Sequence, residues 1–234
     1  MRCFVLAGMA LFLADSPIFA TASSGTNTAT PFVPTEARQL AVQGERAFAK
    51  GNLPEAEALY KKALEFAPEN PPILVSMAAV ETRLGKISES DTFLRHALRA
   101  DLNNGPAWLL LGMNALTQKR DDEAFAALVE ATLHDPGNAR AHNYLGIAAG
   151  RKGWNDCEEQ ELRRAAELNT GYADANFNLA VLYLRRTPPL VELARRHYQR
   201  AVDLGTPHDP LIEAQIAKAV ASPTSPNAPS APLP

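Results

Sequence analysis

The sequence predicts an all-α fold: an α-solenoid of five helix-turn-helix repeats followed by one C-terminal capping helix. Two observations carry this prediction. Small and large apolar residues recur with a period of 34 residues between residues 37 and 208, which is typical of stacked repeats rather than of a single globular core. Glycine and proline gather at the junctions of that period, where they end one helix and begin the next.

The placement of proline supports a helical fold. The chain of 234 residues contains 18 prolines, and a proline inside a helix costs about 3 kcal/mol. Ten of them lie between residues 36 and 210, and each falls at an expected turn or in the first turn of an expected helix. There the missing N–H group has no helical partner to lose, so proline marks the ends of helices.

Composition and charge exclude several classes of protein. The chain has 13 glycines and 18 prolines and is 46% hydrophobic, which rules out a collagen-like or low-complexity chain. Charged residues make up 21% of the sequence and the formal net charge is −3. No basic field therefore points to a nucleic acid as a partner.

Residues 1–22 are predicted to be a signal peptide rather than part of the fold. Arg2 precedes an apolar run over residues 3–14, and Ala20 and Ala22 supply the small side chains of a cleavage site after Ala22. The run is too short to cross a bilayer, which takes roughly 20 residues. We therefore expect export to the periplasm or the medium and no transmembrane span in the mature chain. Residues 23–35 are expected to be a disordered lead-in.

The period is clearest around Trp108. There the sequence places, in order, Trp108, Leu111, Gly112, Ala124, Leu128, Ala131 and Pro136. A matching succession runs from Gly44 to Pro68, two periods earlier. In these residues the chain resembles the tetratricopeptide repeat family, whose repeat has 34 residues. The period gives repeats that start at Ala37, Pro71, Gly105, Ala139 and Ala173.

Each repeat is predicted to bring two antiparallel helices into close contact, because helices approach closely only where no bulky side chain intervenes. The eighth residue of every repeat is small: Gly44, Ala78, Gly112, Gly146 and Ala180. The 27th is always alanine: Ala63, Ala97, Ala131, Ala165 and Ala201. Large residues are expected to fill the spaces between them: Tyr60, Leu94, Leu128, Leu162 and Tyr198.

Repeats 4 and 5 depart from the pattern. Glu158 stands where three of the other repeats have alanine and one has serine, so a carboxylate replaces a side chain that allows close packing. Repeat 5 fits the period with two extra residues in its turn, over residues 187–191.

The elements follow in order. The first helices are expected over residues 37–49, 71–84, 105–118, 139–151 and 173–186. The turns after the first, second and fourth carry Gly51, Gly85 and Gly153, which adopt positive φ at little cost. The solenoid spans residues 36–208, and Asp209 and Pro210 begin a capping helix over 209–221. Residues 222–234 are predicted to be a disordered tail rich in proline, serine and alanine.

The sequence contains no catalytic motif. It has no Gly-x-Ser-x-Gly elbow, phosphate-binding loop, dinucleotide fingerprint or Cys-x-x-Cys pair. His134 and His142 flank one repeat junction but lack the spacing of a helical zinc site, and we interpret them as surface residues. Cys157, alone after cleavage, is interpreted as a small packing residue. We therefore expect no enzyme activity, no metal and no cofactor.

The resemblance implies a concave groove lined by the first helix of each repeat. Read onto this sequence, it gives an apolar floor in repeats 3 to 5 with arginines along one edge. The candidate partner-binding residues are Arg83, Leu109, Met113, Asn143, Ile147, Arg151, Phe177, Val181 and Arg185. The alternative is that some of the apolar residues are buried between neighbouring helices. The clamp for a terminal carboxylate found in some family members is not expected, because Ala41 and Glu45 replace its lysine and asparagine.

The function implied by the resemblance is protein binding without catalysis. The groove suits an amphipathic or extended peptide with acidic groups. An exported protein of this kind is expected to act as an adaptor or assembly factor of the cell envelope. The alternative is a structural scaffold, a homo-oligomer in which exposed repeat ends stack between chains.

Overall fold

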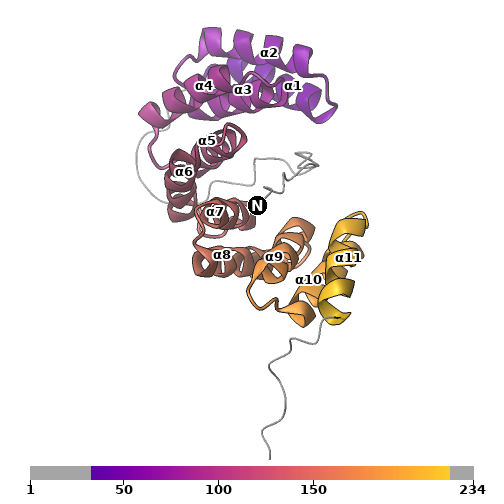
Figure 1. Cartoon of the computed structure of the whole chain (residues 1–234). Helices are drawn as coiled ribbons and strands as arrows, with labels where there is room; N and C mark the ends of the chain where they lie inside the picture. The colour runs from indigo at the N-terminus through magenta and orange to yellow at the C-terminus, as the bar shows by residue number, and fades with distance from the viewer. Residues whose placement is uncertain (1–32, 222–234) are drawn as a thin grey trace, which may run out of the picture.

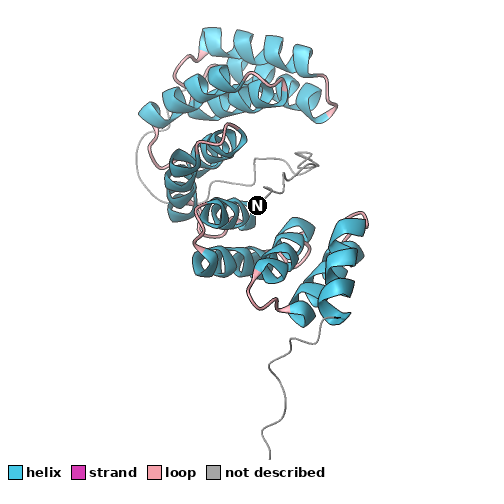
Figure 2. Cartoon of the chain, viewed as in Figure 1, coloured by secondary structure: helices cyan, strands magenta, loops and turns pink. Residues whose placement is uncertain are grey.

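The computed structural model describes residues 33–221. In that range every element of regular structure is a helix, and the helices are joined by short turns (Figure 2). In chain order they are α1 (Thr35–Ala49), α2 (Leu53–Phe66), α3 (Pro71–Arg83), α4 (Ile87–Ala100), α5 (Gly105–Thr117), α6 (Asp121–His134), α7 (Ala139–Arg151), α8 (Asn155–Leu168), α9 (Ala173–Arg185), α10 (Val191–Asp203) and α11 (Pro210–Ala221). The predicted signal peptide, most of the lead-in and the C-terminal tail lie outside the described residues.

The helices form a curved array of hairpins (Figure 1). Each odd-numbered helix from α1 to α9 packs on the helix that follows it, and this pair then packs on the first helix of the next repeat. The first helices lie on the inner side of the curve, and second helices such as α6 and α8 lie on the outer side. The predicted fold class, an α-solenoid of five helix-turn-helix repeats and a capping helix, is confirmed.

Asparagine caps start three of the first helices. The side-chain oxygen of Asn70 accepts from the N–H of Ile73 at 3.1 Å, and Asn104 and Asn138 make the equivalent bond in the next two repeats. These bonds satisfy N–H groups that have no partner within the helix. The 34-residue pattern alone did not predict these caps.

The turn glycines have the backbone geometry that the sequence predicts. Gly51, Gly85 and Gly153 have φ values of 76°, 78° and 76°. Lys119 occupies the equivalent place in repeat 3 and has φ 58°, so one side chain is held in a region that glycine adopts more cheaply.

The closing helix α11 covers the end of the array. Asp209 begins it as an N-cap, and its Oδ1 accepts from the N–H groups of Leu211 and Ile212 at 2.8 and 3.3 Å. Ile212 and Ile216 are buried against Ala180 and Tyr198 of repeat 5. The cap therefore removes apolar surface that the last repeat would otherwise leave in water.

Candidate functional site: the inner face of repeats 3 to 5

Two of the predicted groove residues lie inside the hydrophobic core. Leu109 and Met113 of α5 belong to a buried cluster with Leu145 and Ala148 of α7, and Met113 is only 3% exposed. The expected apolar floor is therefore not an accessible surface in repeat 3. Their burial follows from packing between repeats, because the cluster joins α5 and α6 to α7 of the next repeat, and side-chain spacing within one repeat did not reveal this.

Asn143 is also buried, in a network of side chains. Asn178 of α9 donates from Nδ2 to Asn143 Oδ1 at 2.9 Å, and Asn143 Nδ2 donates to the Tyr172 hydroxyl at 3.4 Å. Buried amides need such partners, because an unpaired one costs about 1–3 kcal/mol. Asn143 thus joins α7 to α9. Asn178, which is not among the predicted groove residues, is half-buried beside it.

The remaining apolar candidates are half-buried on the inner helices. Ile147 packs against the cluster of α5 and α7, whereas Phe177 and Val181 pack against the cluster that includes Tyr198 and Ile216. The rings of Phe177 and Tyr198 lie 6.4 Å apart. These three side chains keep part of their surface outside the core, so they are the apolar groups that a partner could reach.

The three predicted arginines are exposed, but each already has a partner. The Arg83 guanidinium lies 4.8 Å from the centre of the Phe48 ring. Arg151 donates to the Leu116 carbonyl at 2.6 Å and to Asp121 at 3.2 Å. Arg185 donates to Glu158 Oε1 at 2.5 Å. Arg83, Arg151 and Arg185 therefore connect neighbouring repeats and do not form a row of free cations.

The surroundings of Glu158 explain why its departure from the repeat pattern is tolerated. Burial raises the pKa of its carboxyl group, against the opposing effect of Arg185. A Cβ on Gly150 would lie 2.5 Å from the Glu158 carboxyl carbon, so glycine at this place in α7 provides the space that the larger side chain of α8 needs. One oxygen, Oε2, has no hydrogen-bond partner among the described residues.

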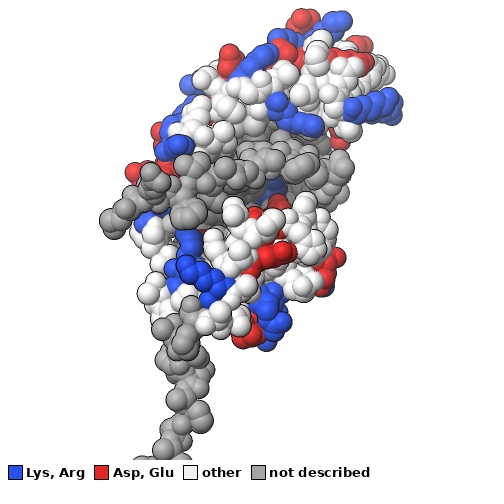
Figure 3. Space-filling view, turned by 45° about the vertical axis from the view of Figure 1, so that its right-hand side comes forward, with Lys and Arg blue, Asp and Glu red and all other residues white. Residues whose placement is uncertain are grey.

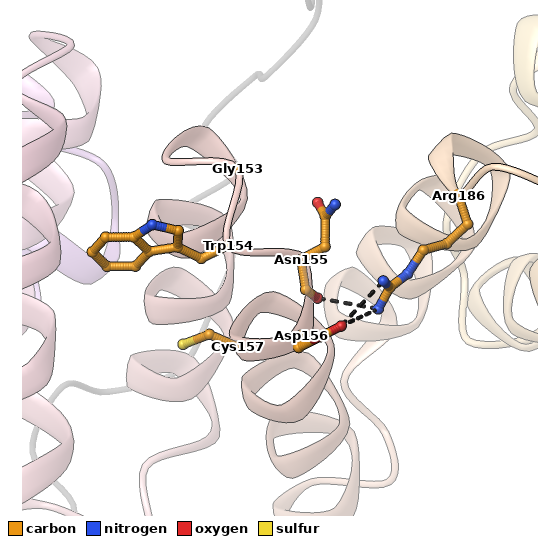
Figure 4. Close-up of a pocket in the computed structure, with 6 residues that line it drawn as sticks. All are labelled: Gly153, Trp154, Asn155, Asp156, Cys157 and Arg186. Atoms are coloured by element: carbon orange, nitrogen blue, oxygen red, sulfur yellow. Dashed lines mark hydrogen bonds and ion pairs between the residues drawn. The ribbon is translucent and has the colours of Figure 1, made fainter.

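The hollow at the start of α8 shows no catalytic arrangement. It is lined by Gly153, Trp154, Asn155, Asp156, Cys157 and Arg186 (Figure 4). Arg186 donates to Asp156 Oδ1 at 3.2 Å and to Glu159 Oε2 at 2.7 Å, while Trp154 and Cys157 point to the opposite side. Burial raises the pKa of the Cys157 thiol, which disfavours the reactive thiolate.

The histidines at the junction of repeats 3 and 4 each have an acidic partner. His134 lies 3.4 Å from Glu130, and His142 lies 2.6 Å from Glu161. No group of three or more potential metal ligands occurs within residues 33–221. On the face drawn in Figure 3, positive and negative side chains are interspersed. No helix in the described range is both long and apolar enough to span a membrane.

Comparison with known sequences points to the same repeat. Residues 47–113 match the tetratricopeptide repeat family model. The chain is 34% identical over 107 residues to the protein CTR9 homolog of Arabidopsis thaliana, and 34% identical over 98 residues to tetratricopeptide repeat protein 7A of Homo sapiens. These matches span 45% and 42% of this chain but only 10% and 11% of those relatives.

Solved structures share the fold over most of the chain. PilF of Pseudomonas aeruginosa has a TM-score of 0.72 with 22% identity, covering 79% of this chain and 84% of its own. A thermophilic tetratricopeptide repeat protein of Thermus thermophilus has a TM-score of 0.62 with 20% identity, covering 79% and 98%. YrrB, described as having an unusual peptide-binding site, has a TM-score of 0.59 with 22% identity, covering 78% and 92%. The architecture is that of a tetratricopeptide repeat solenoid.

Proposed function

We propose that this protein is a non-catalytic protein–protein interaction module of the cell envelope, which binds a peptide or partner protein on the inner face of its repeats. The observation that carries the proposal is that Ile147, Phe177 and Val181 are half-buried apolar side chains on α7 and α9, which lie on the inner side of the curve. Partly exposed apolar groups beside polar ones are what an extended or helical peptide uses as anchor sites. The solenoid fold and the peptide-binding site described for YrrB support this proposal.

We place the proposed contact with a partner in repeats 4 and 5. Leu109, Met113 and Asn143 are buried, so they would support this surface without touching the partner. Arg140 adds a cation there, 5.8 Å from the centre of the Tyr144 ring. Acidic groups on a partner would have to share Arg151 and Arg185 with Asp121 and Glu158, so we expect apolar contact to supply most of the affinity.

Export and an adaptor or assembly role are part of this proposal. They rest on residues 1–22, whose apolar run and small residues before the expected cut after Ala22 are typical of a signal peptide. Cell fractionation and N-terminal sequencing of the mature protein test this step. A protein that keeps Met1 and stays in the cytoplasm would contradict it.

The binding surface is tested with the variant Ile147→Asp/Val181→Asp. Affinity capture from an envelope fraction, followed by quantitative mass spectrometry, should lose the specific partner, because a carboxylate placed in an apolar contact is costly to desolvate. The matched control is Phe66→Asp, which replaces an exposed apolar residue at the end of α2. Circular dichroism checks that both variants fold. Recovery of the same partners by all three proteins would contradict the proposal.

A second candidate function is a scaffold that stacks end to end. It is favoured by the apolar side chains that α11 exposes: Leu211 is 70% exposed, and Val220 is also exposed, on another side of the helix. Terminal caps of soluble solenoids usually have a polar outer face. Exposed apolar side chains on the last helix would allow a further chain to continue the array.

A further inference from the structure

Three places of the repeat meet where one repeat packs on the next. They are the twelfth and twentieth residues of one repeat, on its first and second helices, and the tenth residue of the following repeat. At the first junction these places hold Phe48, Ala56 and Val80, and at the third they hold Leu116, Ala124 and Ala148. In both cases the three side chains lie in or against a single hydrophobic cluster. The first and third junctions are therefore apolar at these places.

The second junction holds polar side chains at the same three places: Thr82, Ser90 and Asn114. Thr82 Oγ1 donates to Asn114 Oδ1 at 3.0 Å, and Asn114 Nδ2 donates to Ser90 Oγ at 2.9 Å. The two hydroxyl oxygens lie 2.8 Å apart, and the Ala78 carbonyl is a further acceptor 3.0 Å from Thr82 Oγ1. The three side chains therefore close a ring of hydrogen bonds between α3, α4 and α5.

The ring is buried and its polar atoms are paired. Ser90 is 0% exposed and Asn114 is 1% exposed. The Asn114 amide also donates to Asp91 Oδ1 at 2.9 Å, and Arg120 donates to Asp91 Oδ2 at 2.6 Å. Because an unpaired polar group is costly in a buried place, each member of the ring depends on the other two.

The fourth junction uses a third kind of chemistry. Gly150 and Glu158 hold its twelfth and twentieth places, and Arg185 of α9 donates to the Glu158 carboxylate at 2.5 Å. Along the chain the junctions are therefore apolar, then hydroxyl and amide, then apolar, then ionic. No junction has the same chemistry at these places as the junction beside it.

A pairing shifted by one repeat would therefore bring unlike side chains together. Asn114 of α5, placed on repeat 1, would meet Phe48 and Ala56, whose side chains have no hydrogen-bonding group for its amide. Ala148 of α7, placed on repeat 2, would leave the buried Ser90 hydroxyl without the amide that now donates to it. Directional hydrogen bonds distinguish these pairings, whereas apolar contacts alone do not.

We propose that the ring of Thr82, Ser90 and Asn114 is a specificity determinant that selects α5 as the neighbour of repeat 2. The repeats share one period and one helical hairpin shape, so shape alone discriminates poorly between correct and shifted pairings. Misassembly between similar units is a characteristic failure of repeat proteins. A buried asparagine fixes the register of coiled coils by the same physical means. The ring thus makes repeat 3, and with it the inner helices of repeats 4 and 5, follow repeat 2 in the correct order.

An exchange of side chains between junctions separates selection from simple stabilisation. Thr82→Leu/Ser90→Ala presents Asn114 with the apolar side chains of the third junction, and Asn114→Ala presents the two hydroxyls with the side chain that α7 would offer. Each mismatch should lower the urea midpoint of the full chain, followed by circular dichroism, by about 0.5–1 M. Thr82→Leu/Ser90→Ala/Asn114→Ala, which matches the third junction at all three places, should regain most of this loss.

Thr117→Ala is the matched control for the loss of a hydroxyl group. The Thr117 hydroxyl donates to the Met113 carbonyl of the same helix at 3.0 Å and takes no part in the ring. The urea midpoint of this variant should stay within about 0.2 M of the wild-type value.

Cross-linking during refolding tests the choice of neighbour directly. Arg95 and Glu123 face each other across the second junction, 4.0 Å apart, and Lys61 holds the place of Arg95 one repeat earlier. In a Cys3→Ser/Cys157→Ser background, a short bis-maleimide should link Arg95→Cys to Glu123→Cys. Lys61→Cys should link to Glu123→Cys only when the triple exchange has removed the ring, because repeat 3 can then pack on repeat 1. Mass spectrometry of the linked peptides identifies each pair, within one chain or between two.

Two results would overturn the proposal. If the triple exchange is less stable than either mismatch, the ring only holds repeats 2 and 3 together and selects nothing. If Lys61→Cys links to Glu123→Cys equally often with and without the ring, repeat 3 finds its neighbour through other contacts. The second result holds even if a mismatched variant does not fold, since it compares only proteins whose junctions are matched.

Discussion

Gly112 shows how one missing methyl group sets the distance between two helices. A Cβ at this position would lie 2.5 Å from Leu128 Cγ, and a Cβ on Gly146 would lie 2.8 Å from Leu162 Cγ. Both distances are shorter than a normal non-bonded contact between carbon atoms. A larger residue would therefore push α6 away from α5 and α8 away from α7. The sequence identified these positions because the steric requirement recurs in every repeat.

His142 is a single residue whose charge affects stability. Its Nδ1 lies 2.6 Å from Glu161 Oε2 of α8, and its Nε2 lies 3.2 Å from the Pro136 carbonyl. Glu161 raises the pKa of His142, and burial opposes this effect. The protonated ring therefore links α7 to α8 by an ion pair that is mostly shielded from water.

We predict that this ion pair makes stability depend on pH. Because the pKa of His142 is higher in the folded protein, its contribution is fully present below about pH 6.5 and is lost as the pH rises through the raised pKa. Urea unfolding at pH 6 and pH 8.5 should show wild type losing on the order of 1 kcal/mol more than His142→Gln. Glu161→Gln should remove the same difference. Parallel pH profiles for the three proteins would refute the prediction.

Helices α7, α8 and α9 meet at the buried carboxylate of Glu158, whose accommodation depends on residues of all three helices. Glu158 of α8 needs both the space provided by Gly150 of α7 and the cation provided by Arg185 of α9. The sequence showed Glu158 as a misfit, because its two compensating residues lie in other helices. In contrast, elements that end at a residue with a special backbone preference, such as the turns at Gly51 and Gly85, were predictable from the sequence.

We predict strong coupling between Gly150 and Glu158. Gly150→Ala should lower the free energy of unfolding by about 1–3 kcal/mol, because its methyl group overlaps the carboxylate. Glu158→Ala restores the alanine of repeats 1, 3 and 5 at that place and should relieve the overlap. In a double-mutant cycle measured by urea unfolding, the double variant should therefore be more stable than Gly150→Ala alone. Additive effects would show that the two positions do not share space.

At the scale of the whole molecule, every packing contact between helices is local. Each helix contacts its partner within the repeat and helices of the adjacent repeat, and none reaches further along the described chain. Stability in such an array is close to a sum of repeat terms and neighbour terms. A change at one end should therefore weaken that end without affecting the other.

We predict this behaviour for Ile216→Ala in the capping helix. Ile216 is buried against repeat 5, and its truncation should cost about 2 kcal/mol. Hydrogen exchange followed by mass spectrometry should show faster exchange in α9 to α11 and no change in α1 to α4. Val220→Ala, an exposed substitution in the same helix, serves as the control. Uniformly faster exchange along the chain would indicate a single cooperative unit.

The sequence by itself determined the repeat, its helices and the close approach within each hairpin. These features depend on residues that are near one another in the chain, such as Gly112 and Leu128, so a fixed period reveals them. The tertiary structure decided which inner residues are accessible: Met113 is buried, whereas Ile147 keeps part of its surface exposed. It also decided which charges are paired and where Trp154 meets Phe125. Such contacts join different repeats, and their geometry depends on how much each repeat rotates against the next, which the residue spacing does not specify.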